Sequence, residues 1–203
     1  MDIEKQIEYF VKLVPEEVTH TRFYHSIRVA QLAERFSSLH GFYSPRKAFL
    51  AGILHDITKQ KTKEFHIEIF HRHGFDFSIL PDPAYHPFSA EYYLCDKYQF
   101  TDEEILSAVK NHTLGGENLP LLDQILFVSD FLGSDFAMRQ TQYANWLSET
   151  EKNLAFGIVL KSKKVMEELL EKSHRIHPTT LATYNHYVNR LPYFDSAQHK
   201  RRH

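Results

Sequence analysis

The stretch AGILHDITK, residues 51–59, places a histidine and an aspartate side by side at the end of an apolar run. Ala51 to Leu54 have the composition of a buried helix. His55 and Asp56 follow directly, with Lys59 close behind. Burying an unpaired carboxylate is costly, so Asp56 is expected to have a partner or to coordinate a metal. The rest of the chain must therefore supply groups that meet this pair.

The overall composition is that of a soluble globular protein. The chain has 203 residues, 42% of them hydrophobic, and one cysteine, Cys95, which excludes an intramolecular disulfide. A formal net charge of −2 provides no field that would attract a nucleic-acid polymer or an anionic membrane. The N-terminus lacks a signal-peptide core, and no apolar run approaches membrane-spanning length. We expect a cytoplasmic protein with a single domain over residues 1–203, its core at about 18–190, and homo-oligomer formation left open.

Nearly every segment shows the apolar spacing of a helix, and none shows sustained period-two alternation, so the sequence predicts an all-α protein. Pro15 is expected to end the first helix. Ser44-Pro45 is expected to begin the helix that carries AGILHD. Thr101 is the predicted N-cap of a later helix, with Glu104 reaching back to it. A long helix is expected over roughly residues 150–173, and helix boundaries within 134–150 are the least defined.

Two further residues lie in surroundings similar to those of the His55-Asp56 pair. His25 shares a helix face with Val29 and Leu32. Asp130 interrupts the second long apolar run, ILFVSDFL. A single helical histidine is more often structural, but two buried carboxylates without a cation would repel each other. A shared metal would remove that repulsion.

The other histidines divide into two groups. His86 precedes a proline at the start of a helix, and His112 ends a helix in AVKNHTLGG. We expect most of the remaining histidines to lie at the surface: His20, His40, His66, His71, His73, His174, His199 and His203. The basic C-terminal run HKRRH is also expected to be solvated.

The pattern of His25, His55-Asp56 and Asp130 resembles the HD superfamily of metal-dependent phosphohydrolases. The resemblance extends over about residues 18–190 and is closest to the YqeK family, through the segments TRFYHSIRVAQLAERF, AGILHDITK, YHPFSAEYY, TDEEILSAVKNHTLG, LLDQILFVSDFL and EKSHRIHPTTLATYN. It implies an HD-domain helical bundle. It also implies a metal-dependent hydrolase that cleaves diadenosine tetraphosphate symmetrically to two ADP with a metal-activated water, a symmetrical bis(5'-nucleosyl)-tetraphosphatase.

The resemblance also implies roles for individual residues. The implied metal ligands are His25, His55, Asp56 and Asp130. The implied catalytic residues are Asp56, Lys59, His86 and His112. The implied substrate-binding residues are Arg22, Lys59, His86, His112, Thr113, Asp130, Arg175 and His177. The implied metal is iron, although imidazole and carboxylate ligands also suit manganese or zinc.

Several alternatives remain open at this point. His86 and His112 could face substrate, which we prefer, or hold a second metal beside the first. The same ligands would serve an HD-domain nucleotidase or phosphodiesterase that acts on another nucleotide. A nucleotide-sensing module without turnover and a helical domain with structural histidines are the remaining hypotheses.

Overall fold

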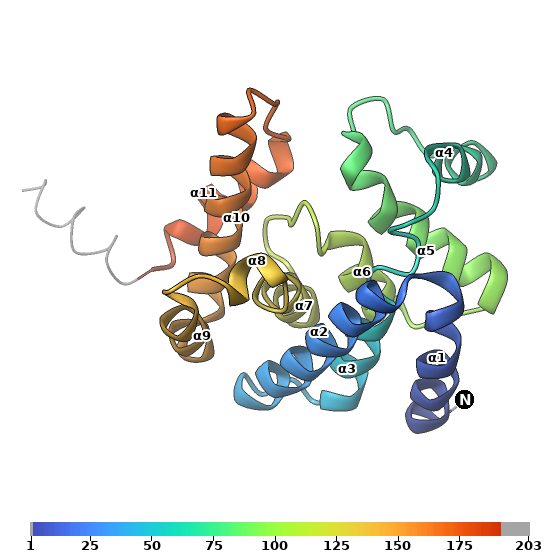
Figure 1. Cartoon of the computed structure of the whole chain (residues 1–203), viewed down its shortest axis with the longest axis horizontal. Coiled ribbons are helices and arrows are strands. Elements are labelled where there is room, and N and C mark those ends of the chain that lie inside the picture. Colours follow the sequence, from blue (N-terminus) through green and yellow to red (C-terminus); the bar gives the residue numbers. More distant parts are fainter. Residues whose placement is uncertain (1, 192–203) are drawn as a thin grey trace, which may run out of the picture.

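The computed structural model describes residues 2–191, and every regular element in that range is helical (Figure 1). The HKRRH run, His199 and His203 lie outside the described residues. The elements are α1 (Ile3–Glu17), α2 (His20–Leu39), α3 (Pro45–Leu54), α4 (Lys63–Arg72), η1 (Asp82–Ala84), α5 (Tyr85–Tyr98), α6 (Glu103–Asn111), α7 (Leu121–Leu132), α8 (Asp135–Met138), α9 (Tyr143–Lys152), α10 (Leu154–Glu171) and α11 (Pro178–Val188).

The centre of the molecule is built from α2, α3, α6 and α7, which pack against one another (Figure 1). α10 pairs with α11 on one side of α7, whereas α4 and α5 form the opposite side with a small core of their own around Phe70. α2 and α3 approach so closely at Gly52 that an added Cβ would lie 2.4 Å from the Ala30 Cα. The apolar stretch of AGILHD is thus buried in the central layer. No helix of the described residues is long and apolar enough to cross a membrane.

Several helix boundaries differ from the sequence prediction. Pro15 lies inside α1, which continues to Glu17 because the Glu17 side chain is held by groups outside the helix. Asp102, and not Thr101, caps α6, because its carboxylate accepts a hydrogen bond from the Ile105 amide at 3.1 Å. The predicted long helix is interrupted at Asn153, whose side chain caps α10. Ser44 caps α3 as expected.

The carboxylate of Glu17 joins α1 to α5 and to the loop before α4. It accepts hydrogen bonds from Lys61 (2.7 Å), Lys97 (2.6 Å), Tyr98 (2.5 Å) and Tyr93 (3.0 Å). Burial by itself would raise the pKa of Glu17, but these hydrogen bonds outweigh it and lower the pKa to about 2. The folded-state pKa lies below the ordinary value of 4.5, so this stabilisation is complete above pH 4.5 and is lost as the pH falls toward 2.

We therefore expect Glu17→Gln to lower the thermal midpoint at neutral pH and to leave it nearly unchanged at about pH 2, where Glu17 itself loses its charge. Thermal unfolding followed by circular dichroism between acidic and neutral pH measures this difference. Glu8→Gln, an exposed substitution in the same helix, is the matched control. A Glu17→Gln deficit that stayed the same across the whole pH range would contradict the assignment.

Candidate metal centre

The HD pair lies at the point where α3 ends. His55 is the C-cap of α3, and its Nδ1–H donates to the carbonyl oxygen of Gly52 at 2.7 Å. Asp56 and the residues up to Gln60 form consecutive turns, so Lys59 does not share a helix with His55. Both His55 and Asp56 are almost fully buried. The end of the helix therefore presents an imidazole and a carboxylate to the interior of the bundle.

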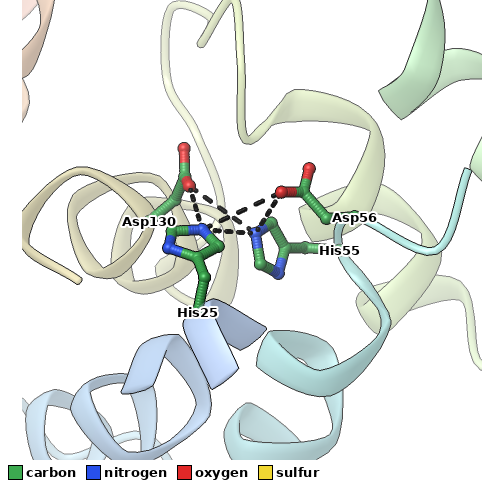
Figure 2. Close-up of side chains that lie close together, drawn as sticks. All are labelled: His25, His55, Asp56 and Asp130. Atoms are coloured by element: carbon green, nitrogen blue, oxygen red, sulfur yellow. Dashed lines mark hydrogen bonds and ion pairs between the residues drawn. The ribbon is translucent and has the colours of Figure 1, made fainter. Parts of the chain in front are cut away.

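All four side chains predicted as metal ligands converge on one point (Figure 2). The Nε2 of His25 lies 3.1 Å from Asp130 Oδ1 and 3.8 Å from Asp56 Oδ2. The Nε2 of His55 lies 3.3 Å from Asp56 Oδ2 and 3.5 Å from Asp130 Oδ1. One ligand atom from each residue falls within 4.8 Å of all the others, so this first cluster could hold a metal ion. It is assembled from α2, the end of α3 and α7.

A second cluster uses the other oxygen of Asp56. Asp56 Oδ1 lies 3.2 Å from His86 Nε2 and 3.5 Å from His112 Nε2. These three residues also satisfy the spacing of a possible metal site. His86 comes from the first turn of α5, and His112 is the C-cap of α6. Asp56 thus faces two clusters at once, one through each oxygen.

Main-chain hydrogen bonds fix the orientation of all four imidazoles. Each Nδ1 lies 2.6–3.2 Å from a carbonyl oxygen: His25 from Gly133, His55 from Gly52, His86 from Pro83, and His112 from Val109. A neutral ring that donates its Nδ1–H in this way presents an Nε2 lone pair to the cluster.

The Nε2 atoms face one another in pairs, 3.3 Å apart for His25 and His55 and 3.1 Å apart for His86 and His112. Lone pairs at these separations repel unless a cation lies between them. The donor set therefore fits a divalent metal in each cluster.

The electrostatics of the centre agree with this reading. Burial by itself would lower the pKa of His55, but the carboxylates of Asp56 and Asp130 outweigh it and raise the pKa to about 9. Burial would raise the pKa of Asp56, yet the facing histidines hold it well below its usual range. Burial dominates at His86 and lowers its pKa to about 3. The two carboxylates of Asp56 and Asp130 thus favour positive charge beside His55.

Buried hydroxyl groups hold His86 from behind. Thr58 Oγ1 donates to the His86 carbonyl oxygen at 2.8 Å, and Ser89 Oγ donates to the same oxygen at 3.1 Å. His66 Nδ1 lies 2.7 Å from Ser89 Oγ. His66 is an exception to the expectation that most of these histidines lie at the surface, because α4 packs against α5 and buries it beside this network. Contacts between separate helices decided this burial, which the polar surroundings of His66 in the sequence did not indicate.

The structure adds one residue that sequence reasoning missed. Lys161 is only 4% exposed, and its ammonium donates to Asp130 Oδ2 at 2.8 Å and to two main-chain carbonyl oxygens. It belongs to a run of lysines at 161, 163 and 164 that resembles a solvated surface. The signal that could have identified it is its spacing of three residues from the buried Ile158 on the apolar face of α10.

Most of the predicted substrate-binding residues surround the two clusters. Arg22 Nη1 donates to Asp56 Oδ2 at 3.0 Å, and the Lys59 ammonium lies 3.2 Å from His86 Nε2. Thr113 Oγ1 lies 3.2 Å from the same nitrogen. Arg175 is exposed, and His177 caps α11 through its Nδ1, which accepts from the Thr179 amide. Within residues 2–191, neither of the last two makes a hydrogen bond or ion pair with the clusters.

A cavity of about 610 Å³ begins at the first cluster and extends between α7, α8 and α10. Asp130 and Lys161 of the metal centre line it together with the apolar side chains of Phe131, Phe136 and Val165 and the carboxylates of Glu167, Glu168 and Glu171. Phe136 is 55% exposed, so an aromatic face is available beside the metal centre. A volume of this size can accept a small organic group.

Comparison with known proteins agrees with the fold and the clusters. Residues 22–133 match the model of the HD domain family, a segment that contains both the HD pair and Asp130. The chain therefore belongs to the HD domain family.

Two bacterial relatives that share one name place the chain in a narrower group within this family. It is 30% identical over 177 residues to the "Bis(5'-nucleosyl)-tetraphosphatase, symmetrical" of Halalkalibacterium halodurans, which covers 86% of this chain and 93% of that protein. It is 30% identical over 183 residues to the protein of the same name from Bacillus subtilis, covering 87% of this chain and 94% of that one.

A solved structure has the same fold. The crystal structure of a "predicted HD superfamily hydrolase involved in NAD metabolism" from Clostridium acetobutylicum gives a TM-score of 0.83 at 21% identity, covering 91% of this chain and 98% of that one. The sequence prediction of an all-α HD-domain bundle of the YqeK type is confirmed.

Proposed function

We propose that this protein hydrolyses diadenosine tetraphosphate symmetrically to two ADP, as a metal-dependent bis(5'-nucleosyl)-tetraphosphatase. The observation that carries the proposal is the pair of clusters that share Asp56, in a chain whose relatives bear the name of that activity. We further propose that residues 2–191 belong to one domain, which the continuous core from α1 to α11 supports, and that the protein acts in the cytoplasm.

In this proposal the first metal position is formed by His25, His55, Asp56 and Asp130. The sequence prediction preferred His86 and His112 facing substrate. We propose instead that they form a second position with Asp56, because their Nε2 atoms lie 3.2 and 3.5 Å from Asp56 Oδ1, the oxygen that does not face the first position. Divalent metals bound at such paired positions lower the pKa of a water molecule and stabilise charge on phosphoryl oxygens. Iron is the proposed metal, and the donor atoms also suit manganese or zinc.

The side chains around the clusters would bind and orient the polyphosphate. Arg22 and Lys59 bring permanent or usual positive charge to the opening of the site, where they can neutralise phosphate oxygens. Thr113 can donate its hydroxyl hydrogen to a phosphate oxygen. Arg175 and His177, which lie directly before α11, are the proposed nucleotide contacts.

The decisive experiment is a product assay with diadenosine tetraphosphate. ADP as the only nucleotide product supports the proposal, whereas AMP with ATP would contradict symmetric cleavage. Treatment with a chelator should abolish turnover, and separate addition of Fe²⁺ without oxygen, Mn²⁺ or Zn²⁺ should identify the metal that restores it. A panel of mononucleotides and cyclic nucleotides tests the alternative of an HD-domain nucleotidase or phosphodiesterase. Tight binding without any turnover would instead indicate a sensing module.

One nucleoside half of the substrate would occupy the cavity beside Asp130, with its base stacked on Phe136. We expect Phe136→Ala to raise KM about tenfold, since base–aromatic stacking contributes about 1–3 kcal/mol and about 1.4 kcal/mol corresponds to a factor of ten. The kcat should change little, because Phe136 does not contact the clusters. Leu39→Ala, at a similarly exposed position at the end of α2, is the control. A Phe136→Ala enzyme with parental KM would exclude this cavity as a base site.

A further inference from the structure

The environment of Lys161 is unusual for a lysine. Its side chain is buried on the apolar face of α10, and burial lowers its pKa below the usual value. The ammonium has three acceptors within hydrogen-bond distance: the His112 carbonyl oxygen (2.7 Å), the Phe127 carbonyl oxygen (3.0 Å) and Asp130 Oδ2 (2.8 Å). An ammonium has three N–H donors, so its hydrogen-bonding capacity is used in full. The nitrogen also lies 4.2 Å from the centre of the Phe127 ring.

Two of these acceptors belong to residues of different clusters. Asp130 turns Oδ1 toward His25 and His55 and gives Oδ2 to Lys161. His112 faces Asp56 in the second cluster with its side chain and gives its main-chain oxygen to Lys161. A single ammonium therefore contacts one member of each cluster from the side opposite to the possible metal positions.

We propose that Lys161 is a positioning residue that fixes one ligand of each metal position, Asp130 in the first and His112 in the second. It fixes the rotation of the Asp130 carboxylate so that only Oδ1 faces the first position. It also fixes the main chain at the end of α6, from which the His112 side chain faces the second metal position. This inference rests on the metal-dependent function proposed above, but it concerns the affinity for metal and not the identity of the substrate.

The physical reason is that a carboxylate on a helix can rotate freely unless its second oxygen is bound. Without Lys161, Asp130 Oδ2 and the two carbonyl oxygens would lose their donor in a buried environment, and the Asp130 carboxylate and the end of α6 would adjust. Partners that orient a ligand from behind are typically worth about 10–100-fold in metal affinity. Because Lys161 contacts both clusters, its loss should weaken both positions.

The test is calorimetric titration of metal-free protein with Mn²⁺, without any nucleotide. We expect Lys161→Met to weaken binding at both positions by about 10–100-fold. Lys161→Gln keeps hydrogen-bond donors and should recover part of that loss. Lys163→Met, at an exposed position two residues along α10, should bind as the parent does.

A second variant separates a specific role from general loosening of the centre. Thr58→Val keeps the shape of the side chain but removes the hydrogen bond to the His86 carbonyl oxygen. We expect it to weaken one position and leave the other at parental affinity. Lys161→Met should therefore weaken Mn²⁺ binding at two positions and Thr58→Val at one, so the variants differ in more than the size of the affinity loss.

The outcomes are distinct. Parental Mn²⁺ affinity at both positions in Lys161→Met and Lys161→Gln would overturn the proposal. Weakening of only one position by both Lys161 variants would also overturn it. Thermal midpoints of the metal-free variants show whether each is folded at the titration temperature, and titrations are made below the lowest midpoint. A protein that binds two Mn²⁺ as expected but does not cleave diadenosine tetraphosphate would refute the proposed substrate and leave the role of Lys161 intact.

Discussion

Asp56→Ala is expected to abolish metal binding at both positions and to lower kcat/KM by about 10³-fold. Among residues 2–191, Asp56 is the one that belongs to both clusters, through Oδ2 on one side and Oδ1 on the other. Metal-ion stabilisation of a phosphoryl transition state is worth several kcal/mol, and a loss of about 4 kcal/mol corresponds to about 10³-fold at about 1.4 kcal/mol per factor of ten. Elemental analysis of the purified variant and steady-state kinetics measure the two effects.

Variants of the flanking histidines provide the comparison. His86→Ala should lose the metal of the second position only, and His25→Ala that of the first only, because each contacts one oxygen of Asp56. Asp96→Asn, at the surface beside Arg72, is the control for a lost carboxylate. If Asp56→Ala retained one metal per chain, the two clusters would not depend on a shared ligand. If it retained full activity, the centre would not be the site of hydrolysis.

Gly52→Ala is expected to have the largest effect on stability of any Gly→Ala substitution in the described residues, at about 3 kcal/mol. The new Cβ would lie 2.4 Å from the Cα and 2.6 Å from the amide nitrogen of Ala30, which are main-chain atoms of α2 that cannot turn aside. For a chain of this length, that loss corresponds to a fall of about 6–12 °C in the thermal midpoint. Differential scanning calorimetry on metal-free protein measures it directly.

Gly116→Ala is the matched control for Gly52. Its Cβ would meet only a methyl carbon of Leu119 at 3.0 Å, which a small side-chain rotation can relieve. We expect a change within about 1 kcal/mol, as for a substitution that adds no buried clash. Equal stability losses in the two variants would show that the close approach of α2 and α3 at Gly52 is not required. A Gly52→Ala protein that folds should also bind metal more weakly, since the Gly52 carbonyl oxygen orients His55.

The helical architecture was predictable because it depends on local patterns, whereas the residues of the first cluster were implied by the resemblance to the HD superfamily. A carboxylate such as Asp130, which interrupts an apolar run, needs a partner when it is buried, and a metal ion is one such partner. The start of the long helix, the N-cap of α6 and the burial of His66 were not predicted correctly. The first two depend on which side chain forms the N-cap, Asn153 for α10 and Asp102 for α6, and the burial of His66 depends on the packing of α4 against α5.

Lys161 shows the same limit at the site itself. A lysine in a lysine-rich run is ordinarily exposed to solvent. The burial of Lys161 is favourable because its ammonium donates to the carbonyl oxygens of His112 and Phe127 and to the carboxylate of Asp130. These acceptors lie 31 to 49 residues away in the chain. No local period encodes their positions. A sequence therefore indicates which residues are chemically out of place more readily than which residues hold them.

The sequence by itself determined the all-α class and marked His25, His55, Asp56 and Asp130 as polar residues in apolar surroundings, and its resemblance to the HD superfamily implied that these four are metal ligands. Apolar periodicity sets which side of each helix is buried, and a polar residue on that side stands out in the sequence. Only the tertiary structure decided that Asp56 turns one oxygen to each of two clusters and that Lys161 donates hydrogen bonds to one residue of each cluster. The physical reason is that the direction of a side chain depends on the packing of α2, α3, α7 and α10 against one another, which is settled only when the bundle closes.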